Sequence, residues 1–472
     1  MAQADIVKSH LVTPEEYGIV PRLSAKLKLS PLDQNMPRMY GSRWILCFPL
    51  PAGVDEKHVF ENLKKALAYT ISAMPWIAGE IGLEEGQNKE SNIVQIVEGQ
   101  GGCEFRCLDR TSDLPSYAEL KKNNFSFSKL TTALVSPLQV VQQSQPVFAA
   151  QANFIKDGLL LTVGVHHSAC DAVALDHILD TWASNTGIEG DLGPFREYDP
   201  IVNDRTPLRR GLPDANIAEF PEYFLMPTAK ASSGLAPPTY KLPPMVSKVF
   251  FVSRPKLEDL KTEARAFSIN DALCAFFWHH MTLARASSSL SPFRSIDNKN
   301  VPTSAALFAV NIRSRTSPPL PRTYLGNACL GSLTKRLTIA SLTHPETGLP
   351  QAAAALRAAL NATHEPSRVS RTIGLLSSRQ NAQDFQFAVK AFLGPDVTMT
   401  SWADLKIRDR DWGSLGTPEG FKIPYEGADG NITIYPRLQN GGLEVMVCLE
   451  SEAMANMVQN QTFLRFAADL DL

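Results

Sequence analysis

The most informative part of this sequence is Gly158-Leu-Leu-Leu-Thr-Val-Gly-Val-His-His-Ser-Ala-Cys-Asp171. Its apolar run predicts a strand that ends at two histidines, with an aspartate four residues after the second one. A second apolar run, Val147–Ile155, precedes it, and the intervening Lys156-Asp157-Gly158 predicts a hairpin turn. His167 is therefore expected at the end of a hairpin strand, where the backbone leaves the sheet for a loop and a functional side chain is well placed.

His167 is suited to proton transfer because an imidazole changes its charge near neutral pH. Asp171 is expected at or just before the first turn of a helix, since Ala172–Trp182 has apolar residues at helical spacing. Spacing alone allows Asp171 to orient the imidazole as in a catalytic triad. Two other interpretations are a metal pair, for which no third ligand stands out, and a histidine that is merely satisfied at a strand end. The combination of two adjacent histidines, a strand end and an aspartate that opens a helix favours His167 as a general base.

The composition is that of a globular protein, with 44% hydrophobic and 20% charged residues in 472. That length predicts two large lobes or about three domains. The formal net charge of -2 argues against general affinity for nucleic acid or acidic membranes. No signal peptide or membrane span is expected, and seven scattered cysteines favour a reducing cytosol over a disulfide scaffold. Cys103 and Cys107 are not expected to bind metal, because no second Cys/His pair stands near them.

The remaining periodicity predicts α/β organisation around a long connection. Strands are expected at Arg43–Leu50, Lys248–Val252 and Leu307–Arg315, and helices at Val59–Ile71, Ser268–His280 and Met454–Phe466. Pro75 ends the first helix, and Ser268 is expected to cap the second. Prolines recur between 195 and 245, which predicts an extended crossover. The expected division is a lobe at 1–195, a crossover at 196–245 and a lobe at 246–472.

Common catalytic motifs do not occur: there is no Gly-x-Ser-x-Gly elbow, no Walker loop and no Gly-x-Gly-x-x-Gly after a strand. Other short pieces follow a recognisable order along nearly the whole chain. They are Ser30-Pro-Leu-Asp-Gln34, Met74-Pro-Trp-Ile-Ala-Gly79, His166-His-Ser-Ala-Cys-Asp171, Ser268-Ile-Asn-Asp271, Val310-Asn-Ile-Arg-Ser-Arg315, Gly326-Asn327, Thr400-Ser-Trp402 and Asp411-Trp-Gly-Ser-Leu-Gly416. In this set and order they resemble the BAHD acyltransferases, which move acyl groups from coenzyme A to alcohols or amines.

The residues of the last motif, Asp411–Gly416, resemble those of a fungal branch of that family, which includes trichothecene 3-O-acetyltransferase. Trp412 stands where plant members have Phe, and Ser414-Leu415 stand where a single Trp is expected. This departure puts the plant substrate classes in doubt more than the chemistry. In the family the glycine-rich element is structural, so the resemblance implies that Asp411, Gly413 and Gly416 support the fold.

The resemblance implies two similar-sized lobes of mixed β-sheet with helices, like chloramphenicol acetyltransferase, and a solvent channel between them with His167 at its middle. His167 would act as the general base, the Trp402 indole would stabilise the oxyanion, and Thr400 or Ser401 would contact the acceptor or coenzyme. Trp402 as an ordinary core aromatic is the alternative. The resemblance also implies that Asp171 pairs with an arginine, Arg313 in preference to Arg315, instead of orienting the imidazole; we follow it on this point.

Other nearby residues are expected to support the fold. His166 is interpreted as a packing neighbour, Cys170 as a small buried filler, and His279 and His280 as core residues. Direct acyl transfer, without a covalent enzyme intermediate, is therefore the expected mechanism.

The expected co-substrate is acyl-coenzyme A, most simply acetyl-coenzyme A, with no permanently bound cofactor. The expected acceptor is a hydroxyl of a polycyclic fungal metabolite, and the chain is expected to be a cytoplasmic monomer. Two alternatives remain open. One is a condensation-type catalyst, although Ala172 stands where that motif has glycine. The other is a metabolite-binding relative without activity.

Overall fold

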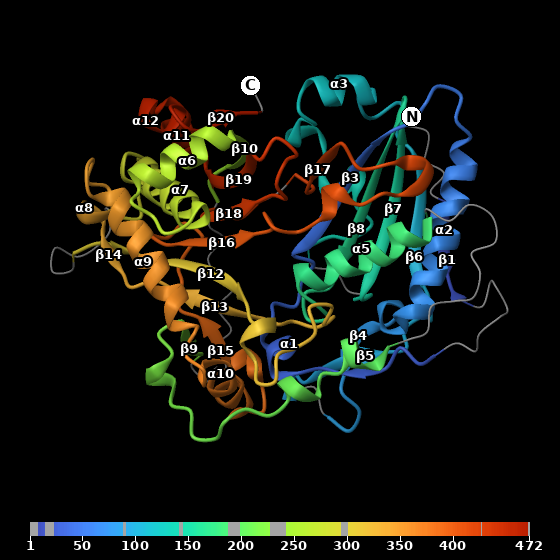
Figure 1. The fold of residues 1–472 in the computed structure, drawn as a ribbon, viewed down its shortest axis with the longest axis horizontal. Coiled ribbons are helices and arrows are strands. Elements are labelled where there is room, and N and C mark those ends of the chain that lie inside the picture. The colour runs from blue at the N-terminus through green and yellow to red at the C-terminus, as the bar shows by residue number, and fades with distance from the viewer. Residues whose placement is uncertain are drawn as a thin grey trace.

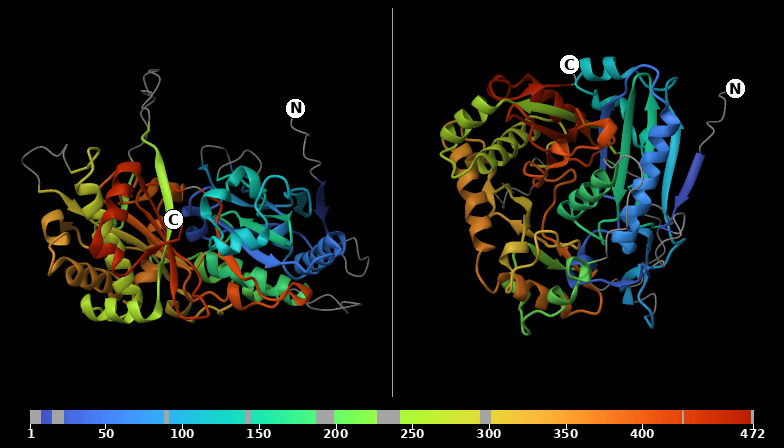
Figure 2. Two further views of the ribbon diagram at one scale, coloured as in Figure 1. Left: turned by 90° about the horizontal axis from the view of Figure 1, so that it is seen from above. Right: turned by 45° about the vertical axis from the view of Figure 1, so that its right-hand side comes forward.

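The computed structural model describes residues 8–14, 23–87, 91–140, 145–186, 199–226, 242–293, 301–425 and 427–470. Their helices and strands form two α/β lobes that lie side by side (Figure 1). Each lobe is built on one large mixed sheet with helices packed against it, which confirms the predicted fold class. The two further views in Figure 2 show the same division, with most of the first half of the chain in one lobe and most of the second half in the other.

The sheet of the first lobe has six strands in the order β1-β6-β7-β8-β3-β17. They are β1 (Lys8–Val12), β6 (Cys103–Asp109), β7 (Phe148–Ile155), β8 (Gly158–Val165), β3 (Ser42–Pro49) and β17 (Gly420–Lys422). Neighbouring strands are antiparallel except for β6 and β7. Because β8 lies between β7 and β3, the strand that leads to His167 is held on both sides.

The predicted hairpin is formed by β7 and β8, whose last pair joins Ile155 to Gly158. Lys156 and Asp157 make the turn, and Asp157 has a positive φ of 58°. Gly158 is already the first strand residue, and a Cβ atom on it would lie 2.4 Å from Tyr117 Cδ2. The glycine at this position therefore leaves room for the Tyr117 ring, while the aspartate takes the left-handed conformation of the turn.

The two faces of this sheet are covered by different helices. Along β3, Trp44, Leu46 and Phe48 belong to the core shared with α2 (Glu56–Ala73) and α5 (Ala172–Thr186). The alternate residues of β3 pack on the other face, under α3 (Tyr117–Lys122) and α4 (Thr132–Val135). This alternation is the period of two expected for a strand buried on both faces.

The sheet of the second lobe has seven strands in the order β13-β12-β16-β18-β19-β10-β20. They are β13 (Cys329–Leu333), β12 (Ala306–Asn311), β16 (Val397–Ser401), β18 (Asn431–Ile434), β19 (Leu443–Glu450), β10 (Met245–Val252) and β20 (Ala468–Asp469). The strands β12, β16 and β18 run parallel to one another. The ends of β12 and β16 consequently lie at the same edge of the sheet.

The helices of the second lobe pack on this sheet around one apolar core. They are α6 (Arg254–Glu263), α7 (Ile269–Ala286), α9 (Gly348–Ala362), α11 (Ser451–Gln459) and α12 (Gln461–Leu464). Ser268 caps α7 in a capping box with Asp271, as predicted. The single helix predicted at Met454–Phe466 was wrong: α11 ends at Gln459, and the Asn460 side chain caps the separate α12.

One strand of the second half joins the sheet of the first lobe. β17 pairs with β3, and Trp412, Leu415 and Phe421 belong to the core of the first lobe. The expected second lobe at 246–472 therefore does not hold for this segment, because the edge of β3 takes its partner from the second half of the chain (Figure 1). The expected boundary at 195/196 lies outside the described residues.

Part of the described crossover packs against the second lobe. Its strand β9 (Tyr223–Leu225) pairs with β15 (Phe385–Phe387), and Leu208, Phe220 and Tyr223 are buried beside α10 (Arg368–Ser377). This strand begins at Tyr223, two residues after Pro221, and residues 227–241 lie outside the described ranges. The smaller elements are α1 (Pro31–Asn35), α8 (Ile339–Leu342), β2 (Leu27–Lys28), β4 (Glu80–Leu83), β5 (Val94–Val97), β11 (Thr303–Ser304) and β14 (Leu337–Thr338).

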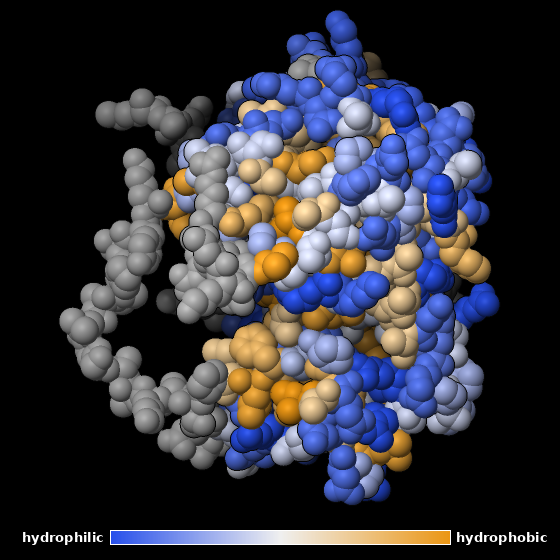
Figure 3. All heavy atoms as spheres, turned by 90° about the vertical axis from the view of Figure 1, so that its left-hand side faces the viewer, coloured by the Kyte–Doolittle hydropathy of each residue, from blue (hydrophilic) through white to orange (hydrophobic). Residues whose placement is uncertain are grey.

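Figure 3 shows the side of the molecule that carries the second lobe, with hydrophilic residues over much of the face and apolar residues in several groups. Among the described residues of the second lobe, the large apolar side chains exposed by about half or more are Phe267, Leu290, Val301 and Phe392. Among the helices that the structure describes, none combines the length and apolar character that crossing a bilayer requires.

Candidate active site

His167 lies in the turn that follows β8. The strand ends at Val165, and the His166 amide still donates to Val147 O at 2.9 Å. The backbone of His167 is then fixed from two directions: its amide donates to Met39 O at 2.9 Å, and its carbonyl accepts from Asn327 Nδ2 at 2.8 Å. Met39 belongs to the first lobe and Asn327 to the second. His167 is therefore anchored at the junction of the lobes.

The His167 side chain lines a cavity of about 210 Å³ between the lobes. Thr400, Ser401 and Trp402, at the end of β16, line the same cavity from the second lobe. A second cavity of about 370 Å³ shares Gly41, Thr400 and Trp402 with the first and continues past Arg43 over mostly apolar residues. The structure thus brings His167 together with the three predicted residues of the second lobe, beside two adjoining cavities.

The surroundings of His167 favour a neutral imidazole. Burial is the largest influence and lowers the pKa of His167 below its usual value. Its own backbone carbonyl, the charge of Asp171 and the Asn327 side chain act in the opposite direction without reversing the shift. A neutral ring at physiological pH has a free nitrogen lone pair, which a general base requires.

Asp171 does not hydrogen-bond to the His167 ring. Arg313 Nη1 donates to its Oδ2 and Arg313 Nη2 to its Oδ1, both at 2.9 Å, and the amides of Ala174 and Ala328 donate at 2.9 Å each. Burial alone would raise the pKa of Asp171, but the charge and hydrogen bonds of Arg313 hold it below its usual value. The carboxylate is therefore ionised and fully engaged, and the triad-like arrangement allowed by its spacing is not formed.

Arg313 is the arginine that meets Asp171, and its position is itself fixed. It follows β12 in a short 3-10 turn, and its Nη2 also donates to Tyr324 O at 2.7 Å and to Gly326 O at 3.1 Å. Arg315 instead contacts His364 and the Asn311 carbonyl. Because Asp171 precedes α5 of the first lobe, the Asp171–Arg313 pair joins the two lobes beside the cavity.

Trp402 combines two environments. Its side chain is 6% exposed and packs edge-on against Trp44, with ring centroids 5.4 Å apart, and parallel to Tyr435 at 6.5 Å. It nevertheless lines both cavities. The two interpretations offered by the sequence, core aromatic and site residue, are therefore compatible with each other.

The Asp411 element lies outside both cavities. Asp411 Oδ1 accepts the Gly413 amide at 3.0 Å, and the Trp412 amide donates to Gly416 O at 2.9 Å. Trp412 is fully buried against Phe48 and Trp182. This segment closes the core of the first lobe just before β17.

The other residues interpreted from the sequence as packing or core residues are buried and line neither cavity. His166 is fully buried edge-on to Tyr40, and burial lowers its pKa to about 3. Cys170 is 1% exposed, and burial raises the pKa of its thiol. His279 and His280 are buried beside α8 (Ile339–Leu342) and α12. Within the described ranges, no three His, Cys, Asp or Glu side chains gather in a way that suits a metal ion.

Several residues around the site were missed by sequence reasoning. Gly41 lines both cavities, and a Cβ atom on it would lie 3.5 Å from the His167 ring. Cys329 lines the smaller cavity from β13. Asn327, which holds the His167 carbonyl, was quoted in a motif but given no role. An Asn after a Gly is a weak signal by itself, so only the fold reveals its position.

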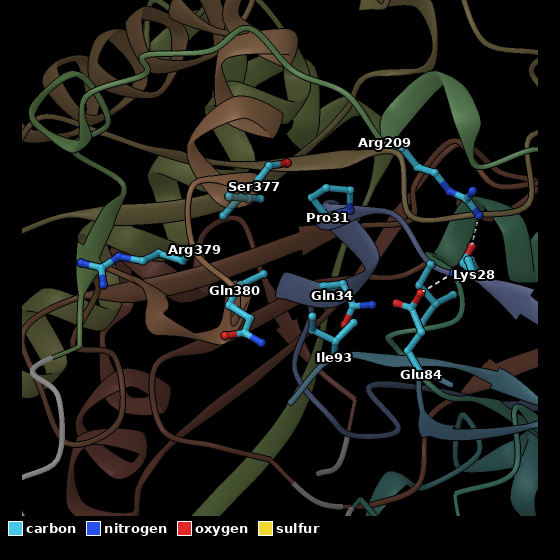
Figure 4. Close-up of a pocket in the computed structure, with 12 residues that line it drawn as sticks. Lys28, Pro31, Gln34, Glu84, Ile93, Arg209, Ser377, Arg379 and Gln380 are labelled. Carbon is cyan, nitrogen blue, oxygen red and sulfur yellow. Dashed lines mark hydrogen bonds and ion pairs between the residues drawn. The ribbon is translucent and has the colours of Figure 1, made fainter. Parts of the chain in front are cut away.

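A further hollow of about 300 Å³ lies apart from these residues, between α1, the end of α10 and the strands β2 and β4. Figure 4 shows the ion pair between the Lys28 side chain and Glu84 and the hydrogen bond that Arg209 donates to the Lys28 carbonyl. Arg379 points away from the other residues. No histidine or carboxylate pair lines it, so it offers no comparable chemistry.

Comparisons with known proteins find similar sequences and similar folds. The acyltransferase easC of Emericella nidulans is 28% identical, covering 95% of this chain and 96% of that protein. The eremophilane O-acetyltransferase ORF8 of Penicillium roqueforti is 25% identical, covering 93% and 98%. Among solved structures, F. graminearum TRI101 in complex with coenzyme A and T-2 mycotoxin has a TM-score of 0.78 at 20% identity, covering 94% of this chain and 99% of that one. Vinorine synthase has a TM-score of 0.65 at 18% identity, covering 99% of both chains.

A model of the Transferase family matches residues 2–464, which is nearly the whole chain. The chain therefore belongs to this family, the BAHD acyltransferases, and is a coenzyme A-dependent O-acyltransferase.

Proposed function

We propose that this enzyme moves an acetyl group from acetyl-coenzyme A to a hydroxyl of a polycyclic fungal metabolite, with His167 as the general base. The observation that carries the proposal is the position of His167. Its neutral ring lines a cavity between the lobes together with Thr400, Ser401 and Trp402, while Asp171 is fully engaged with Arg313.

In the proposed reaction, His167 takes the proton of the acceptor hydroxyl as its oxygen attacks the thioester carbonyl. A hydroxyl is a poor nucleophile at neutral pH, so a base within hydrogen-bond reach must remove the proton during attack. The carbonyl oxygen becomes an oxyanion, for which the Trp402 indole N–H is the proposed donor. Collapse of the tetrahedral intermediate forms the ester and expels the coenzyme A thiolate, which takes the proton back from His167.

The acceptor class is supported by two observations. The larger cavity is lined mainly by apolar residues, including Met39, Ile423 and Met446, which suits a compact hydrophobic molecule. One relative is named an eremophilane O-acetyltransferase, and TRI101 was solved with T-2 mycotoxin. Thr400, which faces both cavities, is the proposed contact to the acceptor, and Ser401 the proposed contact to the coenzyme.

The test is release of free coenzyme A thiol from acetyl-coenzyme A with a panel of polycyclic alcohols, for the wild type and His167→Ala. His177→Ala is a matched control, because His177 is a partly exposed histidine of α5 that contacts Arg322 O. We expect release that depends on the alcohol, loss of that release in His167→Ala and full activity in the control. Equal rates in the wild type and His167→Ala would exclude the general-base role.

A second measurement tests direct transfer. The enzyme is incubated with acetyl-coenzyme A alone, and its intact mass is measured. We expect an unchanged mass; an added acetyl group would instead indicate a covalent enzyme intermediate.

We also propose that the enzyme works in the cytoplasm, because its seven cysteines are all free thiols and most of them are buried.

A further inference from the structure

We infer that Arg205, in the crossover, is a positioning residue for the acyl transfer: it holds the backbone of the loop His166–Asp171 and, through it, the place of the His167 ring. The inference rests on the role proposed for His167. In this role the crossover contributes to the site in addition to connecting the two lobes.

The first observation is the burial and reach of Arg205. Its side chain is fully buried, and its Nη2 donates to Ala169 O at 3.1 Å, inside the loop that carries His167. The same nitrogen lies 3.4 Å from Leu325 O of the second lobe. Arg205 therefore contacts the His167 loop and the second lobe with one guanidinium group.

The second observation is that Arg205 and Asn327 share a carboxylate. Arg205 Nε lies 3.3 Å from Asp33 Oδ2. Asp33 Oδ1 accepts from the amide and the Nδ2 of Asn327, both at 2.9 Å, and that Nδ2 also donates to His167 O at 2.8 Å. Two carbonyls of the loop, at His167 and Ala169, are thus held by side chains that meet at one buried carboxylate.

The third observation is the close packing around the guanidinium group. It lies over the rings of Trp76 and Tyr324, with distances of 5.8 Å and 5.2 Å to their centroids. A Cβ atom on Gly326 would lie 2.6 Å from Arg205 Cζ. The backbone before Asn327 therefore passes directly against Arg205, which leaves the charged group little freedom to shift.

Arginine suits this task for a physical reason. Its planar group donates in several fixed directions at once, whereas the ammonium group of lysine is a single point charge on a flexible chain. Arg205→Lys should keep the positive charge near Asp33 but lose the simultaneous contact with Ala169 O. A displacement of a catalytic group by about 1 Å can reduce the rate about 100-fold.

The experiment compares kcat and KM of Arg205→Lys with two matched controls, with all rates expressed per folded molecule. Arg209→Lys changes an exposed arginine of the same crossover that contacts Lys28 O. Arg357→Lys changes an arginine paired with the buried Asp271, on helices that line neither cavity. We expect kcat of Arg205→Lys to fall about 10- to 100-fold with KM for acetyl-coenzyme A nearly unchanged, and both controls to keep the wild-type kcat.

A purely structural role would lower the unfolding temperature of Arg205→Lys and leave kcat per folded molecule unchanged, which would overturn the inference. If Arg205→Lys does not fold, Arg205→Met combined with Asp33→Asn removes both buried charges together, and its kcat is compared with that of Asp33→Asn alone. Equal values would again overturn the inference. His167→Ala, measured in parallel, separates the two proposals: full activity there contradicts the proposed function, whereas loss there with a normal Arg205→Lys contradicts only the inference.

Discussion

Asp171 and Arg313 form a buried two-pronged ion pair, with both hydrogen bonds 2.9 Å long and both side chains less than 10% exposed. The pair joins the start of α5 in the first lobe to the end of β12 in the second. Farther along α5, Asp176 pairs in the same way with Arg410, at 2.7 Å, from the segment that follows Trp402. The helix that begins beside His167 is therefore fastened to the second half of the chain at two points.

Asp171→Ala should destabilise the protein strongly, because it leaves the Arg313 charge buried without its carboxylate. Removing one partner of a buried pair typically costs about 3–5 kcal/mol. The free energy of unfolding in urea measures this loss. Arg315→Met is the control, since Arg315 is only partly buried and does not contact Asp171, and we expect it to lose less than about 1 kcal/mol. If Asp171→Ala loses no more stability than the control, the Asp171–Arg313 pair does not stabilise the fold.

The pH dependence of kcat/KM should follow the neutral form of His167. Because burial lowers the pKa of His167, the ring stays neutral as the pH falls past about 6.5, and activity should decline only below that point. Initial rates between pH 5 and 8.5 measure this decline. A decline centred above pH 7 would be inconsistent with His167 as the base.

Trp402→Phe should lower kcat about 10²- to 10³-fold, the usual effect of losing one oxyanion donor. The remaining ring should still pack against Trp44 and Tyr435, so the unfolding temperature should change little. Trp44→Phe is the control, because Trp44 belongs to the same aromatic group but lines neither cavity. Equal kcat values for the two variants would show that the indole N–H has no part in the reaction.

The local elements of the site could be predicted because short-range patterns determine them. The hairpin, the end of β8 before His166 and the start of α5 all follow from apolar periodicity and turn residues. The pairing of Asp171 with Arg313 was different. Spacing alone suggested that Asp171 faces the imidazole, and only the family resemblance indicated an arginine 142 residues away.

The long-range features could not be predicted, because contacts between residues far apart in the sequence leave no local pattern. No local pattern tells a strand which sheet it will join, so β17 was expected in the second lobe. Arg205 stands in a proline-rich segment without periodicity, and its burial depends on contacts with residues 33, 169 and 325. Asn460 interrupts a stretch whose apolar spacing is helical throughout, because its side chain caps the following turn.

Gly416→Ala should lower stability without changing kcat per folded molecule. Gly416 has φ 64° and ψ -151°, a combination that costs other residues about 1–3 kcal/mol. An added Cβ atom would have no neighbour within 4 Å, so the cost should come from the backbone alone. Urea unfolding measures it, with the exposed Ser414→Ala as the control. Unchanged stability would show that the segment relaxes, and a reduced kcat would show that it contributes to the site.

His280→Leu should make the stability of the protein less sensitive to acid. His280 is 6% exposed in the core of the second lobe, and burial lowers its pKa to about 3. In the unfolded chain the same group has a pKa of about 6.5. Between these two values only the unfolded state binds the proton, so the native state loses stability as the pH falls below about 6.5.

The effect of His280 can be measured as the difference between the free energies of unfolding at pH 7.5 and 5.5. One such histidine should contribute about 1.4 kcal/mol to this difference. His280→Leu should remove that contribution, while His166, whose pKa is lowered in the same direction, continues to make the protein acid-sensitive. His58→Gln, at an exposed position of α2, should keep the wild-type difference. If His280→Leu also keeps it, the imidazole of His280 must be accessible to protons in the folded protein, and the stability loss in acid must arise elsewhere.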